Sequence, residues 1–370
     1  MEGVSADPAP VRAVLVGAGA IARSHAKAIA ATPGVELAAI VSRGASSARV
    51  LAEEVAASGS RRPQAVGSLG EALGRGRAAG SSDGAAPLVV VATPTSSHLA
   101  VAAEALDAGA HAFIEKPLDV DLDAARAFAR DAREAGEGRV VSVVSQHRFD
   151  AASLSVRDAV RAGRLGTVAS AVATVPWWRS AAYFQASPWR GTFAGDGGGA
   201  LMNQGIHTLD LVVALLGRPV EVMAMTARTV HAIEAEDTAG VLLRFESGAI
   251  ATVHASTAAY PGLSSRLQVS GSLGSAVIEN ETLVYLHTDS APNAPDYGLY
   301  GAGNQLAVAA AAPRADPTES PAGLARQYAD VVGAIRAKRA PAVTVDAALL
   351  TLGVVEAAYR SARERRAVAL

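Results

Sequence analysis

A glycine-rich turn between an apolar run and a helical stretch constrains the fold of this chain more than any other feature. The run Val14–Val16 leads into Gly17-Ala18-Gly19-Ala20-Ile21-Ala22, and the alanine-rich stretch Ala20–Ala30 follows. Strand, G-x-G-x-x-A turn and helix in this order form the fingerprint of a dinucleotide-binding βαβ unit. The sequence therefore predicts a Rossmann domain, and the alternative is a glycine-rich turn in an unrelated α/β protein.

The start of this helix is predicted to bind the phosphates of a dinucleotide. Gly17 permits the tight turn after the strand, and Gly19 lets the pyrophosphate approach the backbone. The amides around Ala20 and Ile21 then face the phosphates, because a helix N-terminus carries partial positive charge. We therefore expect these four residues to contact the cofactor.

The residues after the second predicted strand bear on the choice of cofactor. An acidic side chain there would bind the ribose hydroxyls of NAD, but the chain has Ser42-Arg43. Ser42 can hydrogen-bond the ribose, and the planar Arg43 guanidinium can pair with a 2′-phosphate. The pattern favours NADP over NAD, although Arg43 could instead stack on the adenine.

A third segment, Thr93-Pro94, follows another predicted strand and opens a helix beside the cofactor. Pro94 suits the start of a helix, and nearby hydroxyl groups can cap it. We expect a structural role for His98 and place it, with Thr93 and Pro94, among the cofactor-binding residues.

The tripeptide Glu115-Lys116-Pro117 ends an apolar, strand-like run, Ala110–Ile114. Ligands of doubly wound α/β folds bind outside the carboxyl ends of the strands, so Glu115 and Lys116 are predicted to lie at the cofactor. Lys116 is also expected to meet a substrate hydroxyl beside the nicotinamide ring. The alternative for an isolated lysine is a solvated position at a strand terminus.

The distribution of apolar runs predicts two domains of different class, α/β followed by α+β. Up to about residue 149, β-rich runs alternate with alanine-rich helical stretches, which indicates a parallel sheet with crossover helices. The predicted strands of this part are Ala13–Val16, Glu36–Val41, Leu88–Ala92, Ala110–Ile114 and Val140–Val144.

Later β-rich segments follow one another directly, which predicts an antiparallel sheet. These segments are Glu221–Thr229, Thr238–Phe245, Ala249–Ser256 and Arg266–Ser270, with a hairpin turn at Glu246-Ser247-Gly248. Loops are expected at Gly74–Ala86 and Thr288–Pro321, and closing helices at about Ala322–Lys338 and Ala347–Arg365.

A second glycine-rich segment, Gly197-Gly198-Gly199, precedes a predicted helix that ends at Gly217. The three glycines are expected to let a ligand approach the backbone closely. Apolar side chains recur along the helix at helical spacing and define its buried stripe: Met202, Ile206, Leu209, Val213 and Leu216. Asn203, His207 and Asp210 each lie one residue further along, about 100° around the helix, as a polar row at the edge of a cleft.

His207 is the predicted acid–base residue of this row. An imidazole has an unperturbed pKa near neutrality, as a proton donor and acceptor for an alcohol/ketone couple requires. Asn203, one turn earlier, can hydrogen-bond the substrate or orient the imidazole, but an amide cannot carry a proton away. The alternative for His207 is a structural histidine whose ring is satisfied by Asp210 at i+3.

All three tryptophans fall within one short stretch that includes Trp177-Trp178-Arg179 and Trp189-Arg190. Clustered aromatic side chains and arginines suit a sugar or cyclitol ring, and they suit a subunit interface equally well. We take Trp178 and Arg179 as candidate substrate-binding residues.

Composition excludes several other classes of function. The formal net charge is −2 and no long basic block occurs, so a nucleic-acid partner has no electrostatic support and small neutral or anionic ligands fit better. The chain has no cysteine and its eight histidines are scattered without ligand spacing, so no metal site is expected. The N-terminus does not read as a signal peptide, and the apolar runs are broken before the length of about 18 residues that a membrane helix needs. We therefore expect a cytoplasmic protein without a membrane partner.

The chain resembles the Gfo/Idh/MocA oxidoreductases, named for glucose-fructose oxidoreductase and inositol dehydrogenase. The resemblance spans nearly the whole chain and rests on the Gly17–His25 fingerprint, Thr93-Pro94 with His98, Glu115-Lys116-Pro117, and the glycine run leading to His207 and Asp210. It implies a Rossmann NAD(P)-binding domain at residues 1–145 and a substrate-binding and oligomerisation domain at residues 146–370 with a large, open, mainly antiparallel sheet. Relatives often form dimers or tetramers through this sheet, so a homodimer or homotetramer is expected, with the terminal helices free to pack back on the first domain.

The resemblance also implies roles for individual residues. Lys116 matches the catalytic lysine of the family, and His207 matches its acid–base partner. The family commonly has Asp where this chain has Asn203, which leaves a proton-relay role at that position open. Lys116, Asn203 and His207 are the candidate catalytic residues, and with Asp210 they are candidate substrate-binding residues. The Lys116–Pro117 peptide bond is expected to be cis.

The predicted function is hydride transfer between nicotinamide and a secondary alcohol or ketone of a sugar, a sugar derivative or a cyclitol. His207 would exchange the hydroxyl proton, and Lys116 would stabilise oxyanion charge. Two other classes stay open. A glycosidase-type hydrolase that uses bound NAD for transient oxidation would turn over without a net change in cofactor absorbance, and a non-enzymatic NAD(P)-binding regulator would not need both Lys116 and His207.

Overall fold

The computed structural model describes residues 8–74, 86–134, 138–288, 306 and 321–370. By its internal contacts the chain divides into two compact units. The first comprises Met1–Asp119, Asp123–Val144 and Leu324–Ala347, and the second comprises Val120–Leu122, Ser145–Gly323 and Ala348–Leu370.

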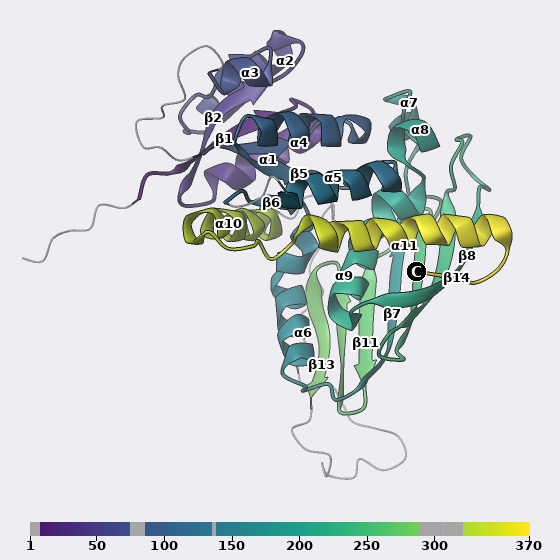
Figure 1. The fold of residues 1–370 in the computed structure, drawn as a ribbon. Helices are drawn as coiled ribbons and strands as arrows, with labels where there is room; N and C mark the ends of the chain where they lie inside the picture. Colours follow the sequence, from purple (N-terminus) through teal and green to yellow (C-terminus); the bar gives the residue numbers. More distant parts are fainter. Residues whose placement is uncertain (1–7, 75–85, 135–137, 289–305, 307–320) are drawn as a thin grey trace, which may run out of the picture. The chain divides into compact units, whose positions relative to one another are not determined.

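A six-stranded parallel sheet forms the centre of the first unit, in the order β3-β2-β1-β4-β5-β6 (Figure 1). Its strands are β1 (Val11–Val16), β2 (Val35–Val41), β3 (Gln64–Val66), β4 (Leu88–Val91), β5 (His111–Ile114) and β6 (Val141–Val143). Every residue of β4 and β5 is buried, as expected where helices cover both faces of a parallel sheet. The strand order reverses between β1 and β4, and ligands of such sheets bind at this switch point.

Alanine-rich helices cover this sheet. The helical elements that lie mainly in the first unit are α1 (Ala20–Ala30), α2 (Ala45–Ala57), α3 (Leu69–Ala72), the 3₁₀ turn η1 (Thr95–Ser97), α4 (His98–Asp107), α5 (Leu122–Glu134) and α10 (Pro321–Ala337). Tyr328 of α10 is fully buried, and its ring centroid lies 5.0 Å from that of Phe113 in β5. Burying one such side chain contributes about 1.5–3 kcal/mol, so α10 is part of the Rossmann core although it lies far along the chain.

An eight-stranded sheet forms the centre of the second unit, in the order β13-β12-β11-β7-β10-β9-β8-β14. Its strands are β7 (Val168–Pro176), β8 (Pro219–Ala227), β9 (Thr238–Phe245), β10 (Ile250–Ser256), β11 (Arg266–Gly271), β12 (Gly274–Glu279), β13 (Thr282–Thr288) and β14 (Val368–Ala369). All neighbours are antiparallel except β7 and β10, which are parallel. Residues of β9 alternate between buried and exposed, so one face of this sheet is packed and the other points outward.

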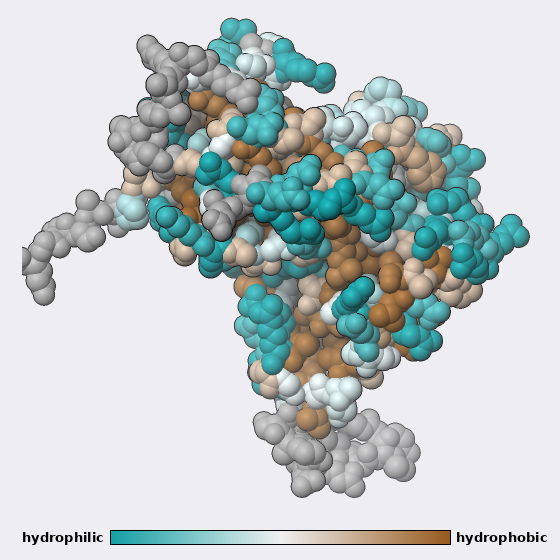
Figure 2. All heavy atoms as spheres, in the orientation of Figure 1, coloured by the Kyte–Doolittle hydropathy of each residue, from teal (hydrophilic) through white to brown (hydrophobic). Residues whose placement is uncertain are grey.

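The helical elements that lie mainly in the second unit are the 3₁₀ turn η2 (Gln146–Phe149), α6 (Ala151–Arg161), α7 (Ala181–Gln185), α8 (Phe193–Asp196), the π-helical turn η3 (Leu201–Gly205), α9 (Ile206–Leu216) and α11 (Val345–Glu364). Of these, α6, η3 and α9 contact strands of the sheet. Packing at η3 is close, because a Cβ atom on Gly205 would lie 2.8 Å from the Ala255 Cβ of β10. Figure 2 shows hydrophilic residues on the outer surface of α6 and hydrophobic residues beside it, over the strands of this unit.

The predicted fold classes are confirmed: a parallel sheet with crossover helices is followed by a mainly antiparallel sheet. The hairpin turn at Glu246–Gly248 joins β9 and β10 as predicted, and Gly248 has a φ of 87°. One prediction needs correction, because the regular helix expected after the glycine run begins as the π-helical turn η3. The loops expected at Gly74–Ala86 and Thr288–Pro321 lie almost wholly outside the described residues.

One helical stretch among the described residues, Phe193–Leu216, has the length and apolar character of a membrane span. Within the structure, 67% of its apolar window is buried. The core helix of a globular domain shows the same combination, so this stretch is weak evidence for a membrane.

Candidate active site

The glycine turn after β1 has the geometry that a phosphate-binding loop requires. Gly17 has a φ of 118°, and a Cβ atom there would lie 2.2 Å from the Ala92 carbonyl oxygen, so glycine is required. A Cβ atom on Gly19 would meet nothing within 4 Å, which leaves its backbone open to a ligand. Helix α1 begins at Ala20 without a side-chain cap. Its first amides therefore suit a pyrophosphate, as in other nucleotide-binding folds.

Ser42 and Arg43 directly follow β2 at the same edge of the sheet. Ser42 is half-buried, and its backbone amide donates to the Val66 carbonyl over 3.2 Å. Arg43 is exposed. An exposed guanidinium at this point suits contact with the ribose end of a dinucleotide.

His98 joins the segments that follow β4 and β5. It is 1% exposed, with Nδ1 lying 2.8 Å from the Pro117 carbonyl oxygen and Nε2 lying 2.9 Å from that of Thr93. Burial lowers the pKa of His98, although the two carbonyl oxygens and nearby carboxylates act in the opposite direction. The geometry gives His98 a structural role, since both ring nitrogens face backbone carbonyls of the predicted cofactor loops.

A buried hydrogen-bonded chain, Tyr328–His25–Glu115, supports the segment that carries Lys116. Nε2 of His25 donates to Glu115 over 2.9 Å, and Nδ1 lies 2.6 Å from the Tyr328 hydroxyl. Burial alone would raise the pKa of Glu115, but the hydrogen bond and charge of His25 hold it below its usual value. The other Glu115 oxygen accepts the Lys116 amide over 3.0 Å. The half-buried Lys116 thus follows a fixed carboxylate, and the Lys116–Pro117 bond is cis, as predicted.

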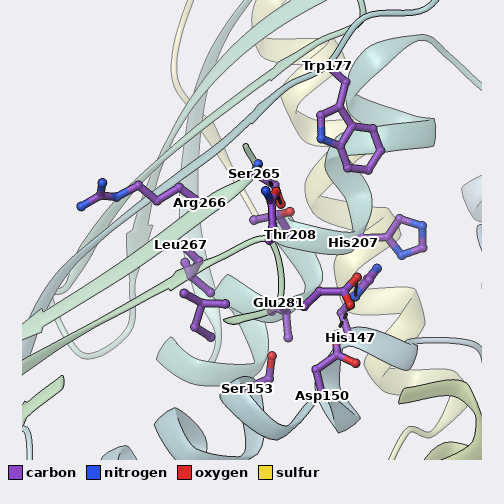
Figure 3. A pocket seen from close by; sticks show the side chains of 13 residues that line it. His147, Asp150, Ser153, Trp177, His207, Thr208, Ser265, Arg266, Leu267 and Glu281 are labelled. Carbon is purple, nitrogen blue, oxygen red and sulfur yellow. Dashed lines mark hydrogen bonds and ion pairs between the residues drawn. The ribbon is translucent and has the colours of Figure 1, made fainter. Parts of the chain in front are cut away.

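A pocket in the second unit contains His207 (Figure 3). Its walls come from η2 and α6, the end of β7, α9, and the β11 to β13 strands with their connections. The lining residues are His147, Asp150, Ser153, Trp177, His207, Thr208, Leu211, Ser265, Arg266, Leu267, Ile278, Asn280 and Glu281. The pocket therefore combines two imidazoles and two carboxylates with an aromatic and an aliphatic wall.

Two histidines meet in this pocket. The ring centroids of His147 and His207 are 5.1 Å apart with the planes at 89°, so one ring presents its edge to the other. Nδ1 of His147 donates to Asp150 over 2.8 Å and lies 3.5 Å from a Glu281 oxygen. Ligand atoms of these three residues all lie within 4.8 Å of one another, a spacing that a metal ion could bridge and that an ion-pair cluster also explains.

Glu281 reaches this cluster from a tight hairpin. The turn between β12 and β13 consists of Asn280 and Glu281, with φ values of 42° and 66°. The Asn280 side chain accepts the Ser265 amide over 3.0 Å and donates to the Ser264 hydroxyl over 3.0 Å. These bonds fix the turn, so that Glu281 faces His147 (Figure 3).

The predicted polar row of Asn203, His207 and Asp210 does not act as one surface. Only His207 is among the pocket-lining residues within the described part of the chain. Asp210 is buried and accepts two hydrogen bonds of 2.6 Å from Arg148 and one of 2.9 Å from Thr351. Asn203 donates to the Gly198 carbonyl over 3.2 Å. The π-helical turn changes the spacing before α9, and this separates Asn203 from the regular row.

The glycine run before this helix serves internal packing, which corrects the expectation of close ligand approach. A Cβ atom on Gly199 would lie 1.8 Å from the Glu236 carbonyl oxygen, and one on Gly198 would lie 2.1 Å from the Tyr359 hydroxyl. The Glu236 carboxylate accepts the amides of Gly199 and Leu201 over 3.0 and 2.8 Å, and burial raises its pKa. Protein atoms therefore fill the space expected for a ligand.

Trp178 and Arg179, the predicted substrate-binding residues of the tryptophan-rich stretch, lie outside the pocket lining. The ring of Trp178 packs at 5.4 Å from that of His231 and 5.3 Å from that of Tyr260. The guanidinium carbon of Arg179 lies 5.3 Å from the centroid of Trp177, which does line the pocket.

Sequence reasoning missed His147, Asp150 and Glu281. A usable signal existed for the first two, because a His and an Asp at i, i+3 directly follow the strand run Val140–Val144. Glu281 carries no such signal, since its place depends on a two-residue turn between strands that the sequence did not predict.

Comparisons with known proteins agree with this architecture. The oxidoreductase family with an NAD-binding Rossmann fold, GFO/IDH/MocA, matches residues 11–144, and the GFO/IDH/MocA C-terminal domain matches residues 153–277. Inositol 2-dehydrogenase of Rhizobium meliloti is 29% identical over 73% of this chain and 76% of its own length. D-apiose dehydrogenase of Paraburkholderia graminis is 28% identical over 97% of this chain and 89% of its own length.

A solved structure extends the likeness to the whole fold. The WlbA dehydrogenase from Bordetella pertussis, in complex with NADH and UDP-GlcNAcA, is 28% identical, with a TM-score of 0.79 over 98% of each chain. Both sheets, the glycine turn and the two domain matches thus point to one assignment. The chain belongs to the Gfo/Idh/MocA oxidoreductase family and is an NAD(P)-dependent dehydrogenase.

Proposed function

We propose that this dehydrogenase transfers a hydride between nicotinamide and a secondary alcohol or ketone carbon of a sugar, a sugar derivative or a cyclitol. The observation that carries the proposal is the half-buried His207 imidazole in a pocket lined by polar side chains. Two similar proteins, named inositol 2-dehydrogenase and D-apiose dehydrogenase, support a polyhydroxylated substrate.

The proposed mechanism divides the work between two residues. In the oxidative direction His207 accepts the hydroxyl proton while the hydride leaves the same carbon, and in the reductive direction it returns the proton to oxygen. Lys116, as an ammonium group, stabilises the negative charge that develops on that oxygen. Bound nicotinamide supplies the hydride acceptor or donor. The proposal requires Lys116 and His207 to reach one substrate, with Asn203 limited to hydrogen bonding because an amide exchanges no proton.

The experiment follows NAD(P)H absorbance with a panel of keto-sugars, inositols, aldoses and nucleotide sugars. Replacing His207 by Ala should lower kcat by about 100- to 10,000-fold, the usual contribution of general acid–base catalysis. A melting curve shows whether the variant is folded. Near-normal turnover in the folded variant would remove His207 from the mechanism, and product release without net cofactor change would indicate the hydrolase instead.

We further propose that NADP is preferred over NAD. The support is the exposed Arg43 after β2, at a point where the chain has no carboxylate. A guanidinium pairs bidentately with phosphate, so Arg43→Ala should lower kcat/KM for NADPH by about 10- to 100-fold and leave that for NADH nearly unchanged. Equal effects on both cofactors would indicate stacking on the adenine.

We also propose that the outward face of the second sheet forms a homo-oligomer interface. Met223, Leu242 and Val172 lie in one cross-strand row with Thr252, and the three apolar side chains are 50%, 44% and 44% exposed. A second copy of the sheet would remove this apolar surface from water. Light scattering should give a dimer or tetramer, and Leu242→Glu should yield a monomer.

A further inference from the structure

Two arginine side chains share the ring of Tyr183, next to the tryptophan that lines the pocket. The guanidinium carbon of Arg179 lies 5.2 Å from the Tyr183 centroid and 5.3 Å from that of Trp177. The guanidinium carbon of Arg190 lies 4.3 Å from the Tyr183 centroid and 5.5 Å from that of Trp189. Both arginines are half-buried, so two positive charges are concentrated around Tyr183, and Arg179 also contacts Trp177, which lines the pocket.

Within the described residues, no carboxylate pairs with either guanidinium. Arg190 donates to the Tyr183 carbonyl over 2.8 Å, and Nε of Arg179 is buried without a hydrogen-bond partner. Four acidic side chains of the neighbouring segments accept hydrogen bonds from backbone amides instead. Asp196 accepts the amide of Gly191, and Glu234 accepts that of Phe193. Glu236 accepts the amides of Gly199 and Leu201, and Asp237 accepts those of Thr229, Val230 and His231.

Removing part of a charged group from water without a counter-charge is unfavourable, and a buried N–H group without an acceptor is costly. Aromatic contacts of the cation–π type offset part of this cost, but they give Arg179 Nε no acceptor. An oxyanion satisfies both needs, because the planar guanidinium fork donates to carboxylate and phosphate oxygens in parallel.

We propose that Arg179 and Arg190 form an anion subsite that takes the carboxylate or phosphate group of the substrate. The inference rests on the proposed function, since Trp177 connects this subsite to the pocket of His207. The substrate is then an acidic sugar derivative, such as a uronic acid or a sugar phosphate, rather than a neutral polyol.

The test measures binding, so that it does not depend on turnover. NADPH-loaded protein is titrated calorimetrically with D-glucose, D-glucuronate, D-glucose 6-phosphate and inorganic phosphate. At least one anion should bind about 10-fold or more tightly than glucose, and the better of the two sugar anions identifies the group that is recognised. Equal affinity for glucose and both sugar anions, or no binding of any anion at millimolar concentration, overturns the proposal.

Variants separate charge recognition from aromatic packing. Arg179→Gln and Arg190→Gln should each weaken anion binding by about 10- to 100-fold and leave glucose binding unchanged. Arg179→Lys should retain part of the preference, because it keeps the charge. The matched control is Arg157→Gln on α6, a half-buried arginine paired with Asp158, which should change neither anion nor glucose binding. Equal losses for glucose and the anions in folded variants would mean that the arginines only pack the aromatic cluster.

Failure of the two proposals can be distinguished. Near-normal turnover by His207→Ala would refute the proposed acid–base role without affecting the anion titrations. Conversely, if the wild-type protein binds anions no better than glucose, the anion subsite is refuted, and the proposed hydride transfer can still act on neutral sugars.

Discussion

The ion pair between Arg148 and Asp210 should control both the stability of the second unit and the arrangement of its pocket. Arg148 follows His147 in η2, and Asp210 lies in α9, one helical turn after His207. The guanidinium donates twice to the carboxylate, with both distances 2.6 Å, and the two side chains are only 17% and 9% exposed. Replacing Arg148 by Met would therefore leave a buried carboxylate without its counter-charge.

The expected cost follows from this geometry. Removing one partner of a buried pair costs about 3–5 kcal/mol, and the lower end applies because Thr351 still donates to Asp210 over 2.9 Å. At about 2–4 °C per kcal/mol for a domain of this size, Arg148→Met should lower Tm by about 6–12 °C. The double variant Arg148→Met with Asp210→Leu should recover much of this loss, because it removes both charges.

Urea unfolding followed by tryptophan fluorescence measures the unfolding free energy of the second unit, since all three tryptophans lie in that unit. Arg157→Met on α6 is the control, because this arginine pairs with its neighbour Asp158, and the two side chains are 36% and 58% exposed. A double-mutant cycle with Asp210→Leu gives the coupling energy. A coupling below about 1 kcal/mol, the range of exposed pairs, would refute the argument.

Two further predictions concern the glycine turn after β1 and the carboxylate of Asp237. Gly17→Ala should destabilise the first unit by about 1–3 kcal/mol in thermal unfolding, because Gly17 has a φ of 118° and the added Cβ atom would lie 2.2 Å from the Ala92 carbonyl oxygen. Gly19→Ala should leave the stability unchanged, because its Cβ atom meets nothing within 4 Å, but it should lower the affinity for NAD(P)H in a titration. Burial would raise the pKa of Asp237, but the amides of His231, Val230 and Thr229 lower it. Its stabilising effect is therefore present above the unfolded carboxyl pKa of about 3.9 and is lost as pH falls through the lower folded value. In urea unfolding, the stability difference between wild type and Asp237→Asn should shrink below about pH 4, and a difference independent of pH would refute this.

The first unit could be predicted closely because its signals are local. The strand run, Gly17, Gly19 and the alanine-rich helix stand next to one another in the sequence, and helix α1 has the predicted bounds Ala20–Ala30. Each parallel strand is also a nearly continuous apolar run, which is easy to recognise. By contrast, β7 in the middle of the second sheet was not predicted, because it is rich in the small residues Ala, Ser and Thr and is not a continuous run of large apolar residues. Its pairing with both β10 and β11 nevertheless organises that unit.

The pocket could not be predicted because its chemistry depends on two departures from regular structure. The π-helical turn Leu201–Gly205 breaks the periodicity from which the polar row was derived and separates Asn203 from His207. Asp210 pairs with Arg148 from the preceding segment, so only His207 of the row lines the pocket. The hairpin turn at Asn280–Glu281, with positive φ at both residues, brings a carboxylate to His147 from more than one hundred positions away. Such turns favour Asn or Gly at the first position and tolerate few others at the second. A Glu at the second position is therefore costly for the turn alone, and in this structure its carboxylate lies 3.5 Å from Nδ1 of His147.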